Sequence, residues 1–162
     1  GIKYVRYERP GIKTETNGVL YCDSYEEAGK IADKMEGNIL VTTGSKDIEK
    51  LVCNIKDRNR IKARVLSTSE SIIKLENIGL NAENIIAMKG PFSQEMNRVM
   101  FTDYKIKILI CKDSGKQGGT DEKMIAAQKS NIHVIVIGRP KIAYPKMFDC
   151  IDEVVDCLKH II

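Results

Sequence analysis

The sequence predicts an α/β protein with a Rossmann-like, mainly parallel sheet of about five strands and helices on both faces. The first observation is that short apolar runs recur at intervals that suit one strand-helix unit. These runs are Ile39–Val41, Ala63–Leu66, Ile85–Met88, Ile108–Cys111 and His133–Ile137. The second observation is that helical patterns, with apolar residues three and four apart, separate the runs. Strands that alternate with helices form a parallel sheet that is buried on both faces.

The helices follow from local signals along the chain. Ser24 is expected to cap the first helix, with Glu27 closing a capping box and Gly37 ending the helix. Later helical segments connect the strands, and a last helix is expected near the carboxyl end. These segments are Asp47–Val52, Ser71–Ile78 (stopped by Gly79), Gln94–Phe101, Glu122–Lys129 and Asp152–His160.

Length and composition are those of an ordinary globular domain. The 162 residues are 43% hydrophobic and 30% charged. A net charge of +4, spread along the chain, and an aromatic content of 6% argue against a nucleic-acid partner. Apolar stretches are shorter than the roughly 20 residues of a membrane span, and no signal peptide is recognisable. We therefore expect neither nucleic acid nor a membrane as a partner.

The cysteines and histidines show no spacing that is typical of a metal site. The five cysteines lack a C-x-x-C pair, and the chain has only two histidines, so no metal is expected. An odd number of cysteines without a spacing pattern indicates reduced thiols and a cytoplasmic protein. His133 begins an apolar run and is expected to be a core residue. Without a Ser/His/Asp or Cys/His arrangement, nucleophilic catalysis is not predicted.

The loop from Lys112 to Lys123 is the most informative feature. Right-handed crossovers place all strand-to-helix loops at one edge of the sheet, where ligands of such folds bind. Glycines in this loop let an anion approach the unpaired N–H groups at a helix start. Lys123 is unfavourable at a helix start, and a bound anion would offset this. The alternatives are an Asx-type turn at Asp113 and a dipole-stabilising role for Glu122.

Four other strand-end loops belong to the same edge, and one of them is Ser67–Ser69. The segment Thr42–Asp47 offers hydroxyls, a glycine and a helix start, and a simple N-cap is the alternative interpretation. Gly90–Ser93 forms a tight turn before an N-cap. Arg139 stands at a strand end, where it can bind a phosphate or carboxylate or form a surface ion pair. The G-x-G-x-x-G and G-x-x-x-x-G-K-[ST] patterns are missing, so neither a standard dinucleotide fingerprint nor a P-loop is predicted.

Nearly the whole chain carries one pattern of strand-end segments. These are Arg6–Pro10, Gly44–Asp47, Arg64–Leu66, Ile86–Ser93 with Asn97, Lys112–Gly115 with Gly118–Gly119 and Glu122–Lys123, Ala126–Ala127, and Arg139–Pro140. In order and interval they resemble the precorrin-6A reductases of corrin (vitamin B12) biosynthesis. The Gly-Pro-Phe-Ser and Lys-Asp-Ser-Gly-x-x-Gly-Gly pieces are specific in combination. One departure is Ser67, where the family commonly has proline.

The resemblance implies an enzyme of two Rossmann-like halves, with NADPH and a tetrapyrrole meeting in the cleft between them. The implied reaction reduces one carbon–carbon double bond of precorrin-6A or its cobalt form, and NADPH donates the hydride. The resemblance covers the family's C-terminal half, and the N-terminal half is expected to be missing from this chain. Residues 1–36 are therefore interpreted as the connection between halves with a first helix, and residues 37–162 as the C-terminal Rossmann-like domain. The expected partners are the tetrapyrrole and the N-terminal half, and an exposed former interface would favour a homodimer.

The residues expected at the site fall into three groups. The candidates for proton transfer are Lys112, Asp113 and Lys123. The candidates for cofactor binding are Thr43, Gly44, Ser45, Lys46, Gly90, Pro91, Phe92 and Ser93. The candidates for substrate binding are Ser114, Gly115, Gly118, Gly119, Glu122 and Arg139. Two other functions stay open: a non-catalytic module that binds a nucleotide or tetrapyrrole, and another nucleotide-binding enzyme of the corrin pathway.

Overall fold

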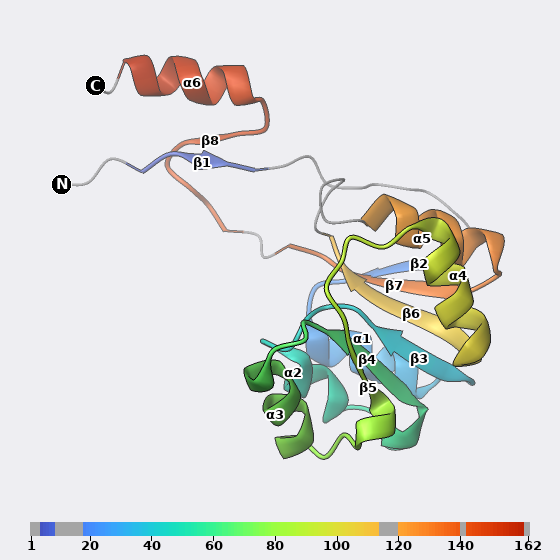
Figure 1. Cartoon of the computed structure of the whole chain (residues 1–162). Coiled ribbons are helices and arrows are strands. Elements are labelled where there is room, and N and C mark those ends of the chain that lie inside the picture. The colour runs from blue at the N-terminus through green and yellow to red at the C-terminus, as the bar shows by residue number, and fades with distance from the viewer. Residues whose placement is uncertain (1–3, 9–17, 114–119, 140–141, 161–162) are drawn as a thin grey trace.

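The main body of the molecule is one parallel sheet, seen in the computed structural model in Figure 1. The structure describes residues 4–8, 18–113, 120–139 and 142–160. Within them the sheet has six strands in the order β2-β7-β6-β3-β4-β5. The strands are β2 (Val19–Cys22), β3 (Asn38–Val41), β4 (Ile61–Val65), β5 (Ile85–Ala87), β6 (Ile106–Lys112) and β7 (His133–Ile137). The predicted fold class is confirmed, with β2 added to the five expected strands.

The strand order reverses between β3 and β6. From β3 the chain moves outward to β4 and β5, and it then returns to β6 on the other side of β3 before continuing to β7. The added strand β2 pairs with β7 at the far edge. Open parallel sheets bind ligands beyond the carboxyl ends of their strands at such a reversal. The topology therefore directs attention to the loops that follow these strands.

Helices cover both faces of the sheet. One face lies under α1 (Tyr25–Asp33), α2 (Ile48–Val52) and α3 (Ser69–Asn77), and the other under α4 (Gln94–Asp103) and α5 (Thr120–Lys129). The side chains of β6 alternate between the two cores: Ile108 and Ile110 join the first, and Leu109 and Cys111 join the second. A strand that is buried on both faces is apolar throughout, which explains the continuous apolar runs in the sequence.

The capping signals of α1 are largely as predicted. Ser24 Oγ accepts a hydrogen bond from the Glu27 backbone N–H at 3.1 Å. The Glu27 carboxylate accepts a hydrogen bond of 3.0 Å from the backbone N–H of Asp23, whereas a capping box would use the N–H of Ser24, one residue later. The helix ends at Asp33, and Gly37, with φ +97°, instead leads the chain into β3.

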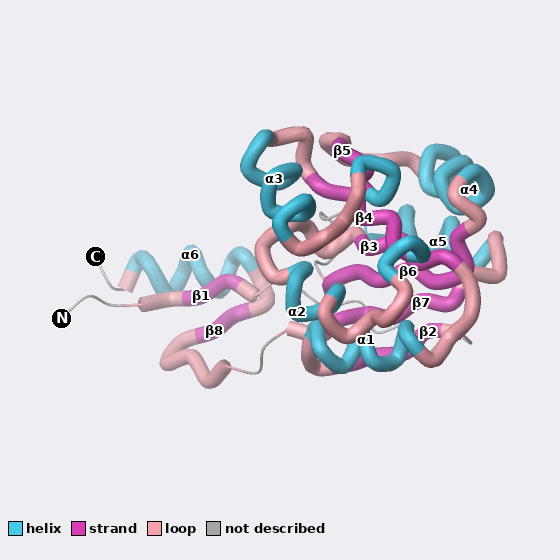
Figure 2. Tube along the Cα trace, turned by 90° about the horizontal axis from the view of Figure 1, so that it is seen from below, coloured by secondary structure: helices cyan, strands magenta, loops and turns pink. Residues whose placement is uncertain are grey.

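Two segments far apart in the chain form a small outlying unit. β1 (Arg6–Tyr7) and β8 (Met147–Phe148) pair as a two-stranded parallel sheet, and α6 (Ile151–Lys159) follows β8. Figures 1 and 2 both show this unit standing apart from the main body. No residue of α6 is buried. The last predicted helix is therefore present, but it does not cover the main sheet, whereas β2 and α1 from residues 1–36 do belong to that sheet and its cover.

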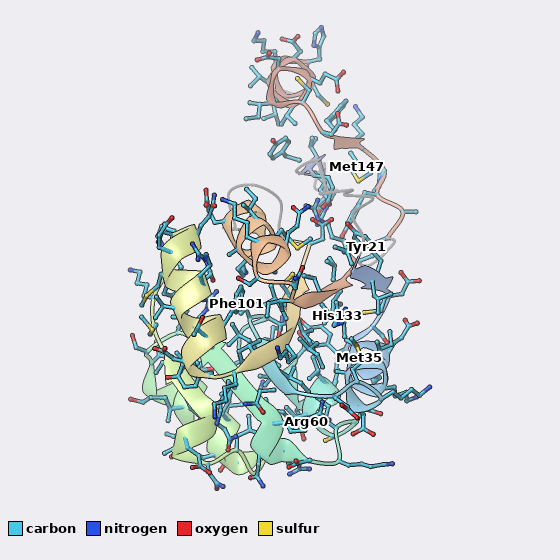
Figure 3. All side chains as sticks on the ribbon, turned by 90° about the vertical axis from the view of Figure 1, so that its right-hand side faces the viewer. Tyr21, Met35, Arg60, Phe101, His133 and Met147 are labelled. Carbon is cyan, nitrogen blue, oxygen red and sulfur yellow. The ribbon has the colours of Figure 1, made fainter. Side chains whose placement is uncertain are left out.

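The prediction that His133 is a core residue was wrong. It is the exposed first residue of β7, and burial begins with Val134. The amino end of this strand lies at the rim of the sheet, so the apolar run enters the core one residue later than expected. Figure 3 labels His133 in the main body and Met147 in the outlying unit.

Candidate functional site

A cavity of about 480 Å³ opens where β3, β4 and β5 end. It lies beyond the carboxyl ends of the strands, on one side of the reversal in strand order. Its walls include five of the predicted site residues, namely Gly44, Gly90, Pro91, Phe92 and Lys123. They also include Arg64 and Asn97, which were not among the predicted site residues.

Arg64 is the fourth residue of β4, and only 6% of its surface is exposed. Its Nη1 donates to Asn97 Oδ1 at 2.9 Å and also meets Met100 Sδ at 3.2 Å. Its guanidinium lies over the Phe92 ring, with Cζ 4.1 Å from the ring centroid. Burial lowers the pKa of Arg64 to about 10. The guanidinium is thus fixed in position by an amide, a thioether and an aromatic face, none of which carries a negative charge.

Asn97 connects Arg64 to the turn that precedes α4. Its side chain is fully buried, and its Nδ2 donates to the Ser93 carbonyl at 2.7 Å. Ser93 caps α4 as predicted, because its Oγ accepts from the N–H of Met96 at 3.1 Å. One amide therefore joins the end of β4, the start of α4 and the turn that carries Phe92.

Lys123 enters the same cavity from the first turns of α5. It is 8% exposed, and its Nζ donates to Thr42 Oγ1, at the end of β3, at 3.3 Å. Its pKa is lowered, chiefly by burial; the nearby Cys111 thiol opposes this shift, and the positive charge of Arg64 adds to it. Two cations therefore share one cavity and repel each other. Within the described part of the chain, neither forms an ion pair with a carboxylate.

Three other predicted charged residues lie together in a second hollow. This hollow, of about 400 Å³, lies where β6 and β7 end and contains Lys112, Asp113 and Arg139. Arg139 Nη1 lies 2.6 Å from Glu8 Oε1, and Nη2 lies 3.6 Å from Asp113 Oδ1. The pKa of Glu8 is lowered, first by its hydrogen bond to Arg6 and also by Arg139. The single crevice expected from the sequence is therefore two hollows on opposite sides of the reversal, and Lys123 is not in the one that holds Lys112 and Asp113.

Several predicted residues line neither hollow. Ser45 Oγ lies 3.1 Å from Ser71 Oγ, the Lys46 carbonyl accepts from Lys74, and Glu122 is exposed. Thr43 is buried, and its hydroxyl bonds the Gly44 carbonyl at 3.4 Å. The remaining predicted substrate residues lie outside the described residues: Ser114, Gly115, Gly118 and Gly119.

The strand order of the parallel sheet reverses, and hollows open beyond its strand ends. These features define an α/β protein of the Rossmann-like type, a class that binds ligands at such hollows. No helix of the described residues combines the length and apolarity that crossing a membrane requires. The chain belongs to the precorrin-6x reductase CbiJ/CobK family, whose sequence model matches residues 1–159. The resemblance found in the strand-end segments is thereby confirmed.

Relatives of the chain carry one enzyme name. It is 35% identical over 159 residues to the cobalt-precorrin-6A reductase of Priestia megaterium, covering 97% of this chain and 62% of that protein. It is 39% identical over 162 residues to the enzyme of the same name from Methanococcus maripaludis, covering 99% of the chain and 62% of that protein. The chain thus spans less than two thirds of the length of these relatives.

A solved structure has the same fold. The structure of a CobK precorrin-6A reductase superposes with a TM-score of 0.73 at 17% sequence identity, covering 96% of this chain and 61% of that one. At this level of identity the likeness concerns the fold alone.

Proposed function

We propose that this chain takes part in the NADPH-dependent reduction of one carbon–carbon double bond of precorrin-6A or cobalt-precorrin-6A during cobalamin biosynthesis. The family supports a reductase that uses a reduced nucleotide. The observation that carries the proposal is the cavity beyond the strand ends, in which Arg64 and Lys123 face ligand space without an acidic partner among the described residues. Both proposed ligands carry negative charge, as phosphates or as carboxylates.

The residues around this cavity fit a polyanionic cofactor. Gly44 adopts φ +80°, and a Cβ there would meet nothing within 4 Å, so the backbone after β3 is open to a ligand. We propose that Thr43–Lys46 and Gly90–Ser93 meet the cofactor, the first segment through the backbone at Gly44, which lines the cavity. When bound, its nicotinamide supplies the hydride. The protein's part is to orient the two ligands and to exclude water.

Addition of a hydride to a conjugated ring leaves negative charge that a proton must neutralise. We propose that Lys112, Asp113 or Lys123 supplies this proton. The lowered pKa of Lys123 makes it a stronger acid than an exposed lysine. We further propose that the segment from Lys112 to Lys123, with Glu122 and Arg139, borders the tetrapyrrole. This segment runs from the end of β6, beside the second hollow, to the buried ammonium in the first cavity.

We propose that a second Rossmann-like half, contained in the remaining length of the relatives, completes the site. The outlying unit supplies a surface for it, because α6 exposes Ile151, Val155 and Leu158, and β8 exposes Met147. On α6 these residues follow a spacing of four and three, which places them on one helix face. In a chain without that second half, the same apolar face favours a homodimer.

Turnover tests the proposal directly. NADPH oxidation is followed by absorbance with the tetrapyrrole present, using this chain alone and then this chain with the complementary half of a relative. We expect turnover only in the combined sample. Turnover by the chain alone would refute the need for a second half. Ligand binding without turnover in both samples would favour the alternative of a non-catalytic binding module.

Lys123 is the residue whose replacement should affect the kinetics most clearly. In the complete enzyme, Lys123→Ala is expected to raise the KM for one of the two ligands by about tenfold, the change that corresponds to one charged contact. The matched control is Lys56→Ala, because the Lys56 side chain is 92% exposed and lines neither hollow. Unchanged kinetics in Lys123→Ala would exclude this lysine from the site.

A further inference from the structure

The cavity contains more buried positive charge than the described residues satisfy. Arg64 and Lys123 are both more than nine-tenths buried, and both line its wall. Their contacts are neutral: the amide of Asn97, the sulfur of Met100 and the ring of Phe92 for Arg64, and the hydroxyl of Thr42 for Lys123. A buried charge is unfavourable unless an opposite charge is paired with it. The missing negative charge is therefore expected to come from a ligand.

The geometry of Arg64 is that of a prepared binding group. Its hydrogen bonds to the described part of the chain use Nη1 alone, so Nε and Nη2 have no partner among those residues. The stacked Phe92 ring and the Asn97 amide hold the guanidinium plane in place, so little conformational freedom is lost when a ligand binds. A guanidinium with free N–H donors matches the two oxygens of a carboxylate or phosphate.

We propose that Arg64 and Lys123 form a two-cation receptor for one oxyanion group, a carboxylate or a phosphate, of the ligand that enters this cavity. Arg64 is then a binding residue supplied by the body of strand β4, while Asn97 and Phe92 are positioning residues. The receptor lies in the site of the proposed reductase, but its existence does not depend on the reaction.

Binding measurements with defined probes test the receptor. Wild-type protein, Arg64→Gln, Arg64→Lys, Lys123→Met and the control Lys56→Met are titrated calorimetrically with inorganic phosphate, NADPH, NADH and the carboxylate-bearing tetrapyrrole uroporphyrin. We expect Arg64→Gln and Lys123→Met to raise the Kd of the best probe at least tenfold, roughly the effect of one charge-assisted hydrogen bond. Arg64→Lys should recover part of the affinity, because it keeps the charge without the fork. Lys56→Met should bind like wild type.

The melting temperature of the unliganded protein separates binding from a structural role. If the two cations only repel each other in the free protein, Lys123→Met should leave the melting temperature of the unliganded protein unchanged or raise it. The same substitution should weaken binding of the probe. The proposal would be overturned if Lys123→Met lowered the melting temperature but left the affinity for the probes unaltered. It would also be overturned if the wild-type protein bound none of the probes. This readout also keeps the test decisive if Arg64→Gln does not fold.

The probes also identify the source of the oxyanion. Tighter binding of NADPH than of NADH, with competition by inorganic phosphate, assigns the receptor to a nucleotide phosphate. Binding of uroporphyrin that responds to both substitutions assigns it to a substrate carboxylate. Either result supports the receptor. If the complete enzyme binds the probes through Arg64 and Lys123 but never oxidises NADPH, the proposed reaction is refuted while the proposed receptor is supported. Failure of the reaction and failure of the receptor are therefore distinguishable.

Discussion

Replacing Ile110 with alanine is expected to lower the free energy of unfolding by about 2–5 kcal/mol, the range for large-to-small changes in a close-packed core. Ile110 is 0% exposed in β6, the strand beside the reversal of strand order. It lies opposite Val41 of β3 and Ile135 of β7 in the strand pairing. The sheet is covered on both faces, so the surrounding side chains can close the new cavity only in part. Urea denaturation followed by circular dichroism measures the loss.

The control for this change is Ile73→Ala in α3. Ile73 is 54% exposed, and the same side-chain truncation there should change the free energy of unfolding by no more than about 0.5 kcal/mol. Ile110→Ala should also unfold at a lower urea concentration with a similar slope, since the surface exposed on unfolding is nearly the same. Equal losses at the two positions would contradict the assignment of β6 to the centre of the core.

The central strands could be predicted because burial on both faces leaves a continuous apolar run. Strand β2 could not be found in this way, because Leu20 and Tyr21 are exposed at the edge of the sheet. Its pairing with β7 joins residues more than a hundred positions apart, and local patterns contain no information about such a partner. For the same reason the pairing of β1 with β8 was invisible in the sequence.

The predicted site residues that line a hollow lie at one edge of the sheet, as expected, but they line two hollows and not a single crevice. Loops at strand ends can be found from sequence, whereas the order of the strands decides which loops are neighbours. Lys112 ends β6 beside the second hollow, whereas Lys123 lies on α5 and reaches Thr42 at the end of β3, so the two lysines border different hollows despite belonging to one predicted loop.

Arg64 was not among the site residues predicted from the sequence, because it lies within strand β4 and not in the loop that follows it. The available signal was its charge, because an arginine inside the predicted apolar run Ala63–Leu66 requires a partner or a ligand when it is buried. Its neighbours in the cavity, Asn97 and Phe92, come from a segment about thirty positions later, so their convergence becomes visible only in the structure.

Asn97→Ala is expected to destabilise the protein by about 3 kcal/mol, because it leaves a buried charged group without its acceptor. The Arg64 guanidinium loses the acceptor of its 2.9 Å bond, whereas the Ser93 carbonyl keeps the bond from the backbone N–H of residue 97. An unsatisfied buried group costs about 1–3 kcal/mol, and a charged one lies at the upper end of that range. The measurement is again urea denaturation, with Asn77→Ala as the control, since Asn77 is the exposed last residue of α3.

A double-mutant cycle with Arg64→Gln then measures how much of this loss comes from the Arg64 charge. When Arg64 is already neutral, Asn97→Ala leaves no stranded charge, so the double variant should lose less stability than the sum of the two single variants, by about 0.5–3 kcal/mol. The effects of the same substitutions on the affinity for the anionic probes should also be non-additive, because Asn97 affects ligand binding only by holding Arg64 in position. Additive effects in both measurements would mean that Asn97 and Arg64 act independently. Asn97 would then not be a positioning residue of the two-cation receptor.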